Sequence, residues 1–117
     1  TRWLKLMTKY RAIRTTVDGI TFDSKREANR YSELKMMEKA GIINSLKLQP
    51  EFKCQINGKK ICTYKADFEY LMVDDIGPQG QIGYYIVEDV KGFKTPVYKL
   101  KKKLVEALFP GTFIKEI

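Results

Sequence analysis

The stretch Tyr85–Gly92, with the sequence YIVEDVKG, constrains the fold more than any other part of the chain. It opens as a β-branched apolar run, which is typical of a buried strand, and then carries two acids and a lysine before a glycine ends it. Because side chains alternate faces along a strand, Asp89 and Lys91 share one face with Val87, and Glu88 lies on the other. Buried charges are costly unless they are paired or bind a metal. The stretch therefore indicates either a functional cluster or a strand that emerges into solvent with a local ion pair.

The length and charge of the chain favour one domain that binds a polyanion. Its 117 residues suit a single core, so we expect residues 1–117 to form one domain. The 22 lysines and arginines exceed the 14 acids, and the resulting net charge of +8 favours nucleic acid as a partner. Since the sequence has no apolar run of about eighteen residues, we expect no membrane span.

The chain contains no histidine, which excludes histidine-based catalytic triads and histidine metal ligands. Its two cysteines, Cys54 and Cys62, cannot form a four-ligand zinc site by themselves. The Asn57-Gly58 turn between them predicts a hairpin that pairs Cys54 with Ile61, so that Cys62 faces the other side of the ribbon. We therefore expect two free thiols and a reducing compartment. Catalysis must then use carboxylates, lysine, tyrosine or a hard metal ion.

The first part of the chain predicts an arm, a hairpin and a helix. Residues 1–11 are basic and aromatic, and they form either an arm that contacts nucleic acid or a lead-in packed on the core. An Asp-Gly turn signal predicts a hairpin over residues 12–22. A helix is predicted at about residues 24–40, with Ser24 as its N-cap and Gly41 as its stop. Glu27 completes a capping box with Ser24, the favoured role, or reaches over the sheet from the apolar side of the helix.

The middle of the chain predicts strands. Residues 46–52 are expected to form a strand, and Pro50 within it indicates either an edge position or a strand start. After the Asn57-Gly58 turn, residues 61–72 are expected to form the returning strand, in which Asp67 interrupts an apolar run. A loop over residues 74–83 then leads into the strand that carries Asp89 and Lys91.

A second helix is predicted after Thr95-Pro96, an N-cap followed by proline at the first helical position. Its buried stripe is expected to comprise four apolar residues at helical spacing, Val97, Leu100, Leu104 and Leu108. Its other faces carry a run of lysines that either form a solvated face or follow phosphates. Residues 112–117 are expected to form a last strand. Together the elements predict an α/β or α+β domain with one mixed sheet and helices packed on it.

Three acids and one lysine stand out as a candidate site: Glu27, Asp67, Asp89 and Lys91. The last three lie on neighbouring predicted strands, and Glu27 lies on the helix before them. Oxygen ligands from several elements suit Mg²⁺, which prefers carboxylates and keeps some of its waters. A lysine beside the metal can help to orient the attacking water or stabilise charge on a phosphate.

These residues resemble, in order, the motifs of the PD-(D/E)XK nuclease superfamily. Glu27 in SKREA matches the helical glutamate, Asp67 in YKADF the first aspartate, and Asp89-Val90-Lys91 the (D/E)XK element. The segment Leu48-Gln49-Pro50 resembles the one preceding the hairpin in transposon-end-cleaving endonucleases and Holliday-junction resolvases. The order of all four motifs is similar to that of a family of small, uncharacterised phage proteins. One departure is an alanine, instead of proline, directly before the first aspartate.

The resemblance implies a restriction-endonuclease-like αβββαβ core, a central mixed sheet flanked by helices, and an Mg²⁺- or Mn²⁺-dependent endonuclease that hydrolyses DNA. Glu27, Asp67 and Asp89 would hold the metal, and Lys91 would act on the water or the scissile phosphate. Strand alternation selects Asp89 over Glu88 as the ligand, although a bulge would exchange them. The DNA would be held by the basic arm and by Lys94, Lys99, Lys101, Lys102 and Lys103, and Gln49 would either contact the DNA or orient a metal ligand.

The short chain leaves no room for a separate sequence-reading module. We therefore expect structure-specific cleavage of branched DNA, such as Holliday-junction resolution in phage recombination, in the cytoplasm of the infected bacterium. Two symmetric cuts would require a homodimer. Two alternatives remain: a nuclease-like fold that binds nucleic acid without turnover, which predicts salt-dependent binding only, and a basic protein whose charges are structural, which predicts no stabilisation by divalent metal.

Overall fold

The computed structural model describes residues 13–91 and 93–117, so the basic arm predicted over residues 1–11 lies outside the described residues. The chain divides into two compact units, Thr1–Met36 and Met37–Ile117. Within the described residues, neither helix is long and apolar enough to cross a membrane. That residues 1–117 form one domain stays a prediction.

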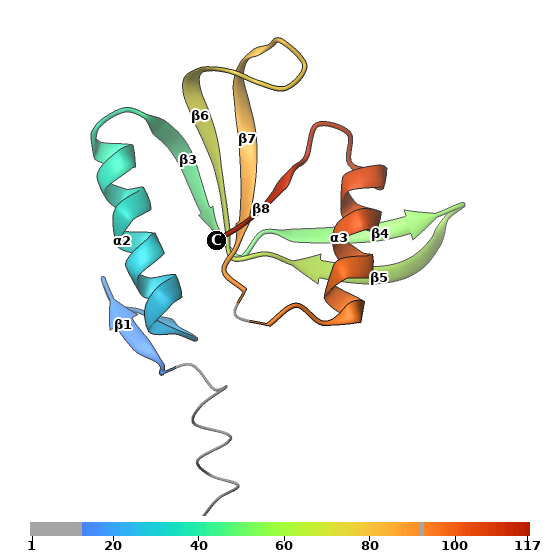
Figure 1. The fold of residues 1–117 in the computed structure, drawn as a ribbon, viewed down its shortest axis with the longest axis horizontal. Coiled ribbons are helices and arrows are strands. Elements are labelled where there is room, and N and C mark those ends of the chain that lie inside the picture. Colours follow the sequence, from blue (N-terminus) through green and yellow to red (C-terminus); the bar gives the residue numbers. More distant parts are fainter. Residues whose placement is uncertain (1–12, 92) are drawn as a thin grey trace, which may run out of the picture. The chain divides into compact units, whose positions relative to one another are not determined.

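The described part of the first unit consists of a hairpin and most of one helix (Figure 1). Strands β1 (Thr15–Val17) and β2 (Ile20–Phe22) pair antiparallel. Asp18 and Gly19 between them have φ angles of 53° and 74°, as a type I′ turn requires, which confirms the predicted hairpin. Helix α2 (Lys25–Lys39) follows. The rings of Phe22 and Tyr31 lie 5.0 Å apart and pack the hairpin against the helix.

Helix α2 begins and ends as the sequence predicts. The Ser24 side-chain oxygen accepts a hydrogen bond from the Glu27 backbone N–H at 3.0 Å, which satisfies one of the donors left open at the helix start. At the other end Gly41 has a φ of 77°, and its N–H donates to the Glu38 carbonyl. The N–H of Ile42 donates to the Met37 carbonyl, which completes a Schellman motif.

The second unit is built on a four-stranded mixed sheet with the strand order β3-β6-β7-β8 (Figure 1). Strands β3 (Ile43–Leu48), β6 (Phe68–Ile76) and β7 (Ile82–Asp89) are antiparallel neighbours. Helix α3 (Pro96–Leu108) makes the crossover to β8 (Ile114–Glu116), which pairs parallel with β7. The order α2, β3, β6, β7, α3, β8 is αβββαβ, so the predicted α+β fold with a mixed sheet is confirmed.

A second, two-stranded sheet is inserted between β3 and β6: the hairpin of β4 (Glu51–Ile56) and β5 (Lys59–Lys65). The single strand predicted over residues 46–52 is therefore wrong. Gln49 has a φ of 51° and Pro50 has no N–H, so the chain turns there and enters a different sheet. The single strand predicted over residues 61–72 is also wrong. Its first part belongs to β5 in the two-stranded sheet, and its last part belongs to β6 in the four-stranded sheet.

The boundaries of the loop between β6 and β7 also differ from the prediction. A loop was expected over residues 74–83, but β6 continues to Ile76 and β7 begins at Ile82. The pairing of Ile76 with Ile82 extends the hairpin into the predicted loop.

The register of the β4–β5 hairpin brings the two cysteines together. Ile56 pairs with Lys59, as predicted, but a bulge after Cys54 places this residue directly opposite Cys62 and not opposite Ile61. Residues directly opposite in an antiparallel pair lie on the same face. The prediction that the two thiols face opposite sides is therefore wrong, although both cysteines are free, as expected.

The core of the second unit lies where α3 packs on the β4–β5 hairpin and on β7 and β8. Its buried residues include Phe52, Tyr64, Val87, Tyr98, Val105 and Ile114.

The predicted buried stripe of α3 is only half right. Leu104 and Leu108 pack against the core, but Val97 is 62% exposed and Leu100 67% exposed. Tyr98 takes the inward position because its ring packs on Tyr64 and its hydroxyl donates to Glu116 at 2.7 Å. The N-cap prediction is confirmed, since the Thr95 side chain accepts a hydrogen bond from the Tyr98 N–H.

Candidate functional site

Asp67, Asp89 and Lys91 lie together where β6 begins and β7 ends; we call them the carboxylate–lysine cluster. The Asp67 N–H donates to the Glu88 carbonyl at 3.1 Å, which ties the residue before β6 to the end of β7. The Asp67 Oδ2 accepts the N–H of Val90 at 2.7 Å. The Lys91 Nζ lies 3.4 Å from the Asp89 Oδ1. Three of the four predicted site residues are thus brought together by one end of the sheet.

Tyr64 holds the second oxygen of Asp89. The Asp89 side chain is only 1% exposed, and the Tyr64 hydroxyl donates to its Oδ2. Burial, then the hydrogen bond to Asp89 and the nearby carboxylates of Asp89 and Asp67, raise the pKa of Tyr64 far above its ordinary value. The Tyr64 hydroxyl therefore remains a proton donor at physiological pH, and both carboxylates lie close enough to act on it.

Tyr64 was not among the predicted site residues. Tyr64 belongs to the YKADF motif. In a continuous strand Tyr64 and Asp67, which are three residues apart, would face opposite sides. Both can face the cluster because β5 ends at Lys65, before that aspartate. An aromatic residue at such a position is more often a core residue, so its role became visible only through its partner, Asp89.

Lys91 is oriented from its other side by Tyr98. The Lys91 Nζ lies 4.8 Å from the centroid of the Tyr98 ring, a cation–π contact. Burial, followed by the hydrogen bond to Glu116, raises the pKa of Tyr98 above its ordinary value. In turn, the hydrogen bond from Tyr98 and the charges of Lys94 and Lys102 lower the pKa of Glu116. The lysine thus bridges a neutral ring and a buried carboxylate.

Glu88 occupies the opposite face of β7. It is fully buried, and the Tyr70 hydroxyl donates to its carboxylate. The pairing of β6 with β7 is continuous from Phe68 opposite Glu88 to Met72 opposite Tyr84, so no bulge exchanges the two acids there. As strand alternation predicted, Asp89 and not Glu88 lies on the side of Lys91.

Glu27 belongs to the first unit and is 7% exposed on α2. Its backbone N–H takes part in the capping interaction with Ser24 that the sequence predicts. A place for its carboxylate beside the carboxylate–lysine cluster stays a prediction.

The donors that the second unit brings together fit a hard divalent cation. Within residues 13–91 and 93–117, no group of three acidic or cysteine side chains is arranged as a metal site. The carboxylate–lysine cluster nevertheless supplies two carboxylates, Asp67 and Asp89. Mg²⁺ is usually bound by one or two carboxylates, with waters and substrate phosphates completing its octahedron. The chemistry of this donor pair therefore suits Mg²⁺ or Mn²⁺.

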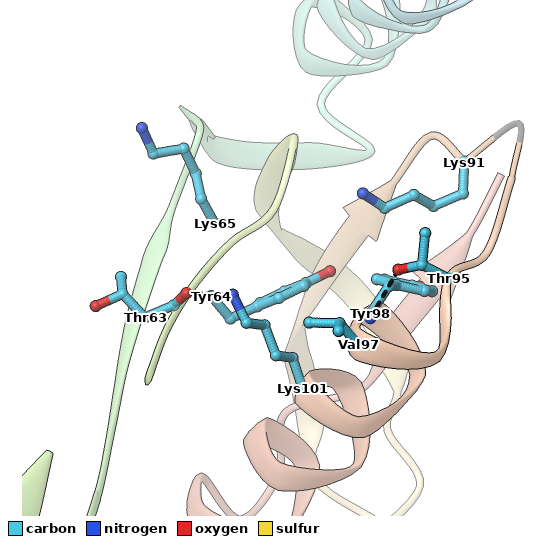
Figure 2. A pocket seen from close by; sticks show the side chains of 8 residues that line it. All are labelled: Thr63, Tyr64, Lys65, Lys91, Thr95, Val97, Tyr98 and Lys101. Atoms are coloured by element: carbon cyan, nitrogen blue, oxygen red, sulfur yellow. Dashed lines mark hydrogen bonds between the residues drawn. The ribbon is translucent and has the colours of Figure 1, made fainter. Parts of the chain in front are cut away.

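A cavity of about 340 Å³ opens beside the cluster, between β5 and the first half of α3 (Figure 2). Its lining combines hydroxyl groups, apolar side chains and three lysines: Thr63, Tyr64, Lys65, Lys91, Thr95, Val97, Tyr98 and Lys101. The Lys65 Nζ points away from the cavity and lies 3.8 Å from the Glu51 Oε1. The Lys101 Nζ donates to the Thr63 carbonyl at 3.3 Å, which fixes this lysine across the gap between helix and strand. Since lysine is the only charged residue type in this lining, the cavity suits an anionic ligand.

The residues predicted to contact DNA are distributed unevenly. Lys101 lines the cavity, and Lys99 and Lys103 are exposed on α3. Lys94 and Lys102 instead form ion pairs with Glu116, at 3.2 and 3.7 Å.

Gln49, the other predicted DNA contact, has an exposed side chain on the turn between β3 and β4. Its N–H donates to the Asp67 carbonyl at 2.9 Å. It is therefore bound to the cluster through its backbone, and its contact with DNA stays a prediction.

Comparison with known proteins identifies the family of the chain and assigns it no activity. No curated protein and no solved structure matches it. The model of one family, described as protein of unknown function (DUF1064), matches residues 7–115, which includes the whole carboxylate–lysine cluster and the cavity beside it. This protein is therefore a member of the DUF1064 family.

Proposed function

We propose that this protein is a divalent-metal-dependent phosphodiesterase that acts on DNA. The observation that carries the proposal is the convergence of the Asp67 and Asp89 carboxylates with the Lys91 ammonium group at one end of the sheet. Two acids and a lysine from adjacent strand ends, beside a cavity lined by further lysines, provide ligands for a metal and a binding surface for a phosphate. The motifs that resemble those of PD-(D/E)XK nucleases contain the same three residues.

Each member of the cluster has a role in this chemistry. Asp67 and Asp89 would hold Mg²⁺ or Mn²⁺, with Glu27 as a further ligand; the bound ion supplies an activated water and stabilises charge on the phosphate. Lys91 orients the attacking water or balances negative charge on the scissile phosphate. Tyr64 fixes the Asp89 carboxylate by binding its Oδ2, which leaves Oδ1 on the side of Lys91.

The lysine-lined cavity gives the substrate its second anchor. Lys91, which follows β7, and Lys101 of α3 both line the cavity, so a phosphate bound there would meet two ammonium groups. With a net charge of +8 on the chain, nucleic acid is the polyanion that fits best. We further propose branched DNA as the substrate, a homodimer as the active form, and the cytoplasm of a phage-infected bacterium as the location.

One observation favours a second function, a nucleic-acid-binding module without turnover. The Asp89 carboxylate is buried and already engaged by both Tyr64 and Lys91, which is also how a purely structural buried acid would be satisfied. In that case the lysines would bind DNA while the cluster only supports the fold.

Cleavage assays separate the two functions. Branched and linear DNA are incubated with and without Mg²⁺, using wild-type protein, Asp89→Ala, Lys91→Ala and, as a control, Lys115→Ala, which changes an exposed lysine of β8. We expect Mg²⁺-dependent cleavage by the wild type and the control, and a loss of at least about hundredfold in the two cluster variants. DNA binding without cleavage by any protein would support the binding module, and equal cleavage by all four would reject the site.

A further inference from the structure

Three large apolar side chains are exposed around the start of α3. Phe93 is 77% exposed, and Val97 and Leu100 are the two residues of the predicted stripe that lie outside the core. Val97 and Leu100 are three residues apart and so lie on one face of the helix, while Phe93 precedes the N-cap Thr95 by two residues. We call these three residues the apolar ridge. Exposed apolar groups gathered in one place mark a binding surface more often than chance exposure does.

The surface around the ridge is strongly basic. Residues 91–103 contain six lysines and no acid. Glu116 neutralises part of this charge through its pairs with Lys94 and Lys102, whereas Lys99 and Lys103 are exposed. A ligand for this region must therefore combine negative charge with an apolar face.

The lysine-lined cavity joins the two properties in one place (Figure 2). Val97, a ridge residue, lines it together with the rings of Tyr64 and Tyr98, and its ammonium groups come from Lys91 and Lys101. Its volume of about 340 Å³ is at the lower end of the range for small-ligand pockets. Such a site suits one nucleotide, with its base on the apolar wall and its phosphate on the lysines.

We propose that the apolar ridge and this cavity bind an unpaired nucleotide of the DNA substrate. The inference rests on the nucleic-acid part of the proposed function and narrows its substrate class. A base inside a duplex has both faces covered by its neighbours, so only a single strand, an open end or a branch point offers a face to apolar or aromatic side chains. The site lies next to Asp89 and Lys91, so the open part of the substrate is held beside the cluster.

Other occupants fit the observations less well. A second copy of the chain packed symmetrically on this face would bring Lys99 and Lys103 of both copies together, which is repulsive. An acidic peptide or an anionic membrane would match the charge, but the lysines and apolar groups converge in a cavity and do not flank a flat apolar stripe.

The test measures binding without cleavage. Fluorescence anisotropy in metal-free buffer with a chelator gives the affinity for a single-stranded, a forked and a blunt duplex oligonucleotide. The variants are Phe93→Ala and Leu100→Ala, and the matched control is Ile82→Ala, which shortens an equally exposed apolar side chain at the start of β7. We expect Phe93→Ala and Leu100→Ala to weaken single-strand and forked binding about fivefold to hundredfold. Duplex affinity, and all affinities of the control, should stay within about twofold of wild type.

Several results would overturn the inference. In the ridge variants, these are an equal loss of affinity for duplex DNA, or no loss of affinity for any DNA. A third is that polyglutamate competes with the oligonucleotide as strongly as a single strand of equal charge does. A fourth is that the protein binds anionic vesicles and that this binding depends on Leu100. The cleavage assay keeps the two proposals separate. Ridge-dependent single-strand binding without Mg²⁺-dependent cleavage would refute the nuclease and support the inference. Cleavage that depends on Asp89, together with wild-type binding by the ridge variants, would refute the inference alone.

Discussion

Replacement of Tyr64 by phenylalanine tests how the buried carboxylate of Asp89 is maintained. The change removes one hydroxyl group and keeps the ring, which packs against Phe52 and Tyr98. It therefore leaves the core intact and deletes the hydrogen bond to the Asp89 Oδ2. Because the Asp89 side chain is only 1% exposed, bulk water is a poor substitute for the lost donor.

The expected cost follows from the charge and burial of the acceptor. A hydrogen bond to a charged group contributes about 1.5–3 kcal/mol, and loss of one partner leaves the other only partly satisfied. For a chain of this size, that loss lowers the melting temperature by about 6–12 °C. The remaining ion pair with Lys91, at 3.4 Å, prevents a larger loss.

Tyr70→Phe is a matched control on the other face of β7. Tyr70 is also buried, and its hydroxyl donates to the buried carboxylate of Glu88. Both variants thus remove a tyrosine hydroxyl from a buried acid, and we expect similar losses of stability. Only Tyr64→Phe changes a group that orients a proposed metal ligand.

Urea unfolding with and without Mn²⁺ distinguishes the two variants. At a concentration of 100 times the Kd, a bound ion stabilises the native state by about 2.7 kcal/mol. We expect this increment in the wild type and in Tyr70→Phe, and a clearly smaller one in Tyr64→Phe. A Tyr64→Phe protein as stable as wild type would refute the argument that this hydroxyl satisfies Asp89, and an unchanged Mn²⁺ increment would refute its role in positioning a ligand.

Three further predictions concern the thiols and the titratable groups. Because Cys54 and Cys62 are directly opposite, treatment with a small-molecule disulfide should link them in an intramolecular bridge by thiol–disulfide exchange and raise the stability by about 2.5 kcal/mol. Mass spectrometry should show the loss of two hydrogens. A product that contains mixed disulfides and no intramolecular bridge would contradict the register. Since the pKa values of Tyr64 and Tyr98 are raised, the contribution of these two hydroxyls to stability should be constant below about pH 10 and should fall above it, where tyrosines of the unfolded chain ionise first; urea midpoints that do not fall above about pH 10 would contradict their burial. Since the pKa of Glu116 is lowered, its contribution to stability is present above the ordinary glutamate pKa and is lost as the pH falls through the lowered value. A titration of the Glu116 carboxyl group by NMR should show this low midpoint, and Tyr98→Phe should raise the midpoint. An ordinary midpoint in the wild type would contradict the contacts of Glu116 with Tyr98, Lys94 and Lys102.

The features predictable from the sequence are those set by neighbouring residues. The Asp18-Gly19 and Asn57-Gly58 turns both adopt the positive φ angles that their residue types favour. The caps of α2 depend on Ser24 and Gly41, which act within one turn of the helix. The alternation that selects Asp89 over Glu88 needs only an unbroken strand.

The features that were mispredicted depend on distant partners. The bulge after Cys54 shifts the register of the hairpin from Cys54 back to Glu51 at small local cost, and no residue type marks it. Tyr98 turns inward because its hydroxyl reaches Glu116 in β8, far along the chain, and Val97 and Leu100 are exposed as a result. The role of Tyr64 could not be inferred for the same reason, since Asp89 lies on another sheet.

The most direct test of the central claim is the binding of Mn²⁺ to the carboxylate pair, measured by electron paramagnetic resonance. Asp67→Asn is the informative variant, because its amide oxygen can still accept the Val90 N–H while the charge is lost. Glu69→Gln removes an acid from the neighbouring strand position and serves as the control. We predict that wild type and Glu69→Gln bind Mn²⁺ and that Asp67→Asn and Asp89→Asn, although folded, do not. Equal binding by all four proteins, or no binding by the folded wild type, would contradict a metal-dependent site at this end of the sheet.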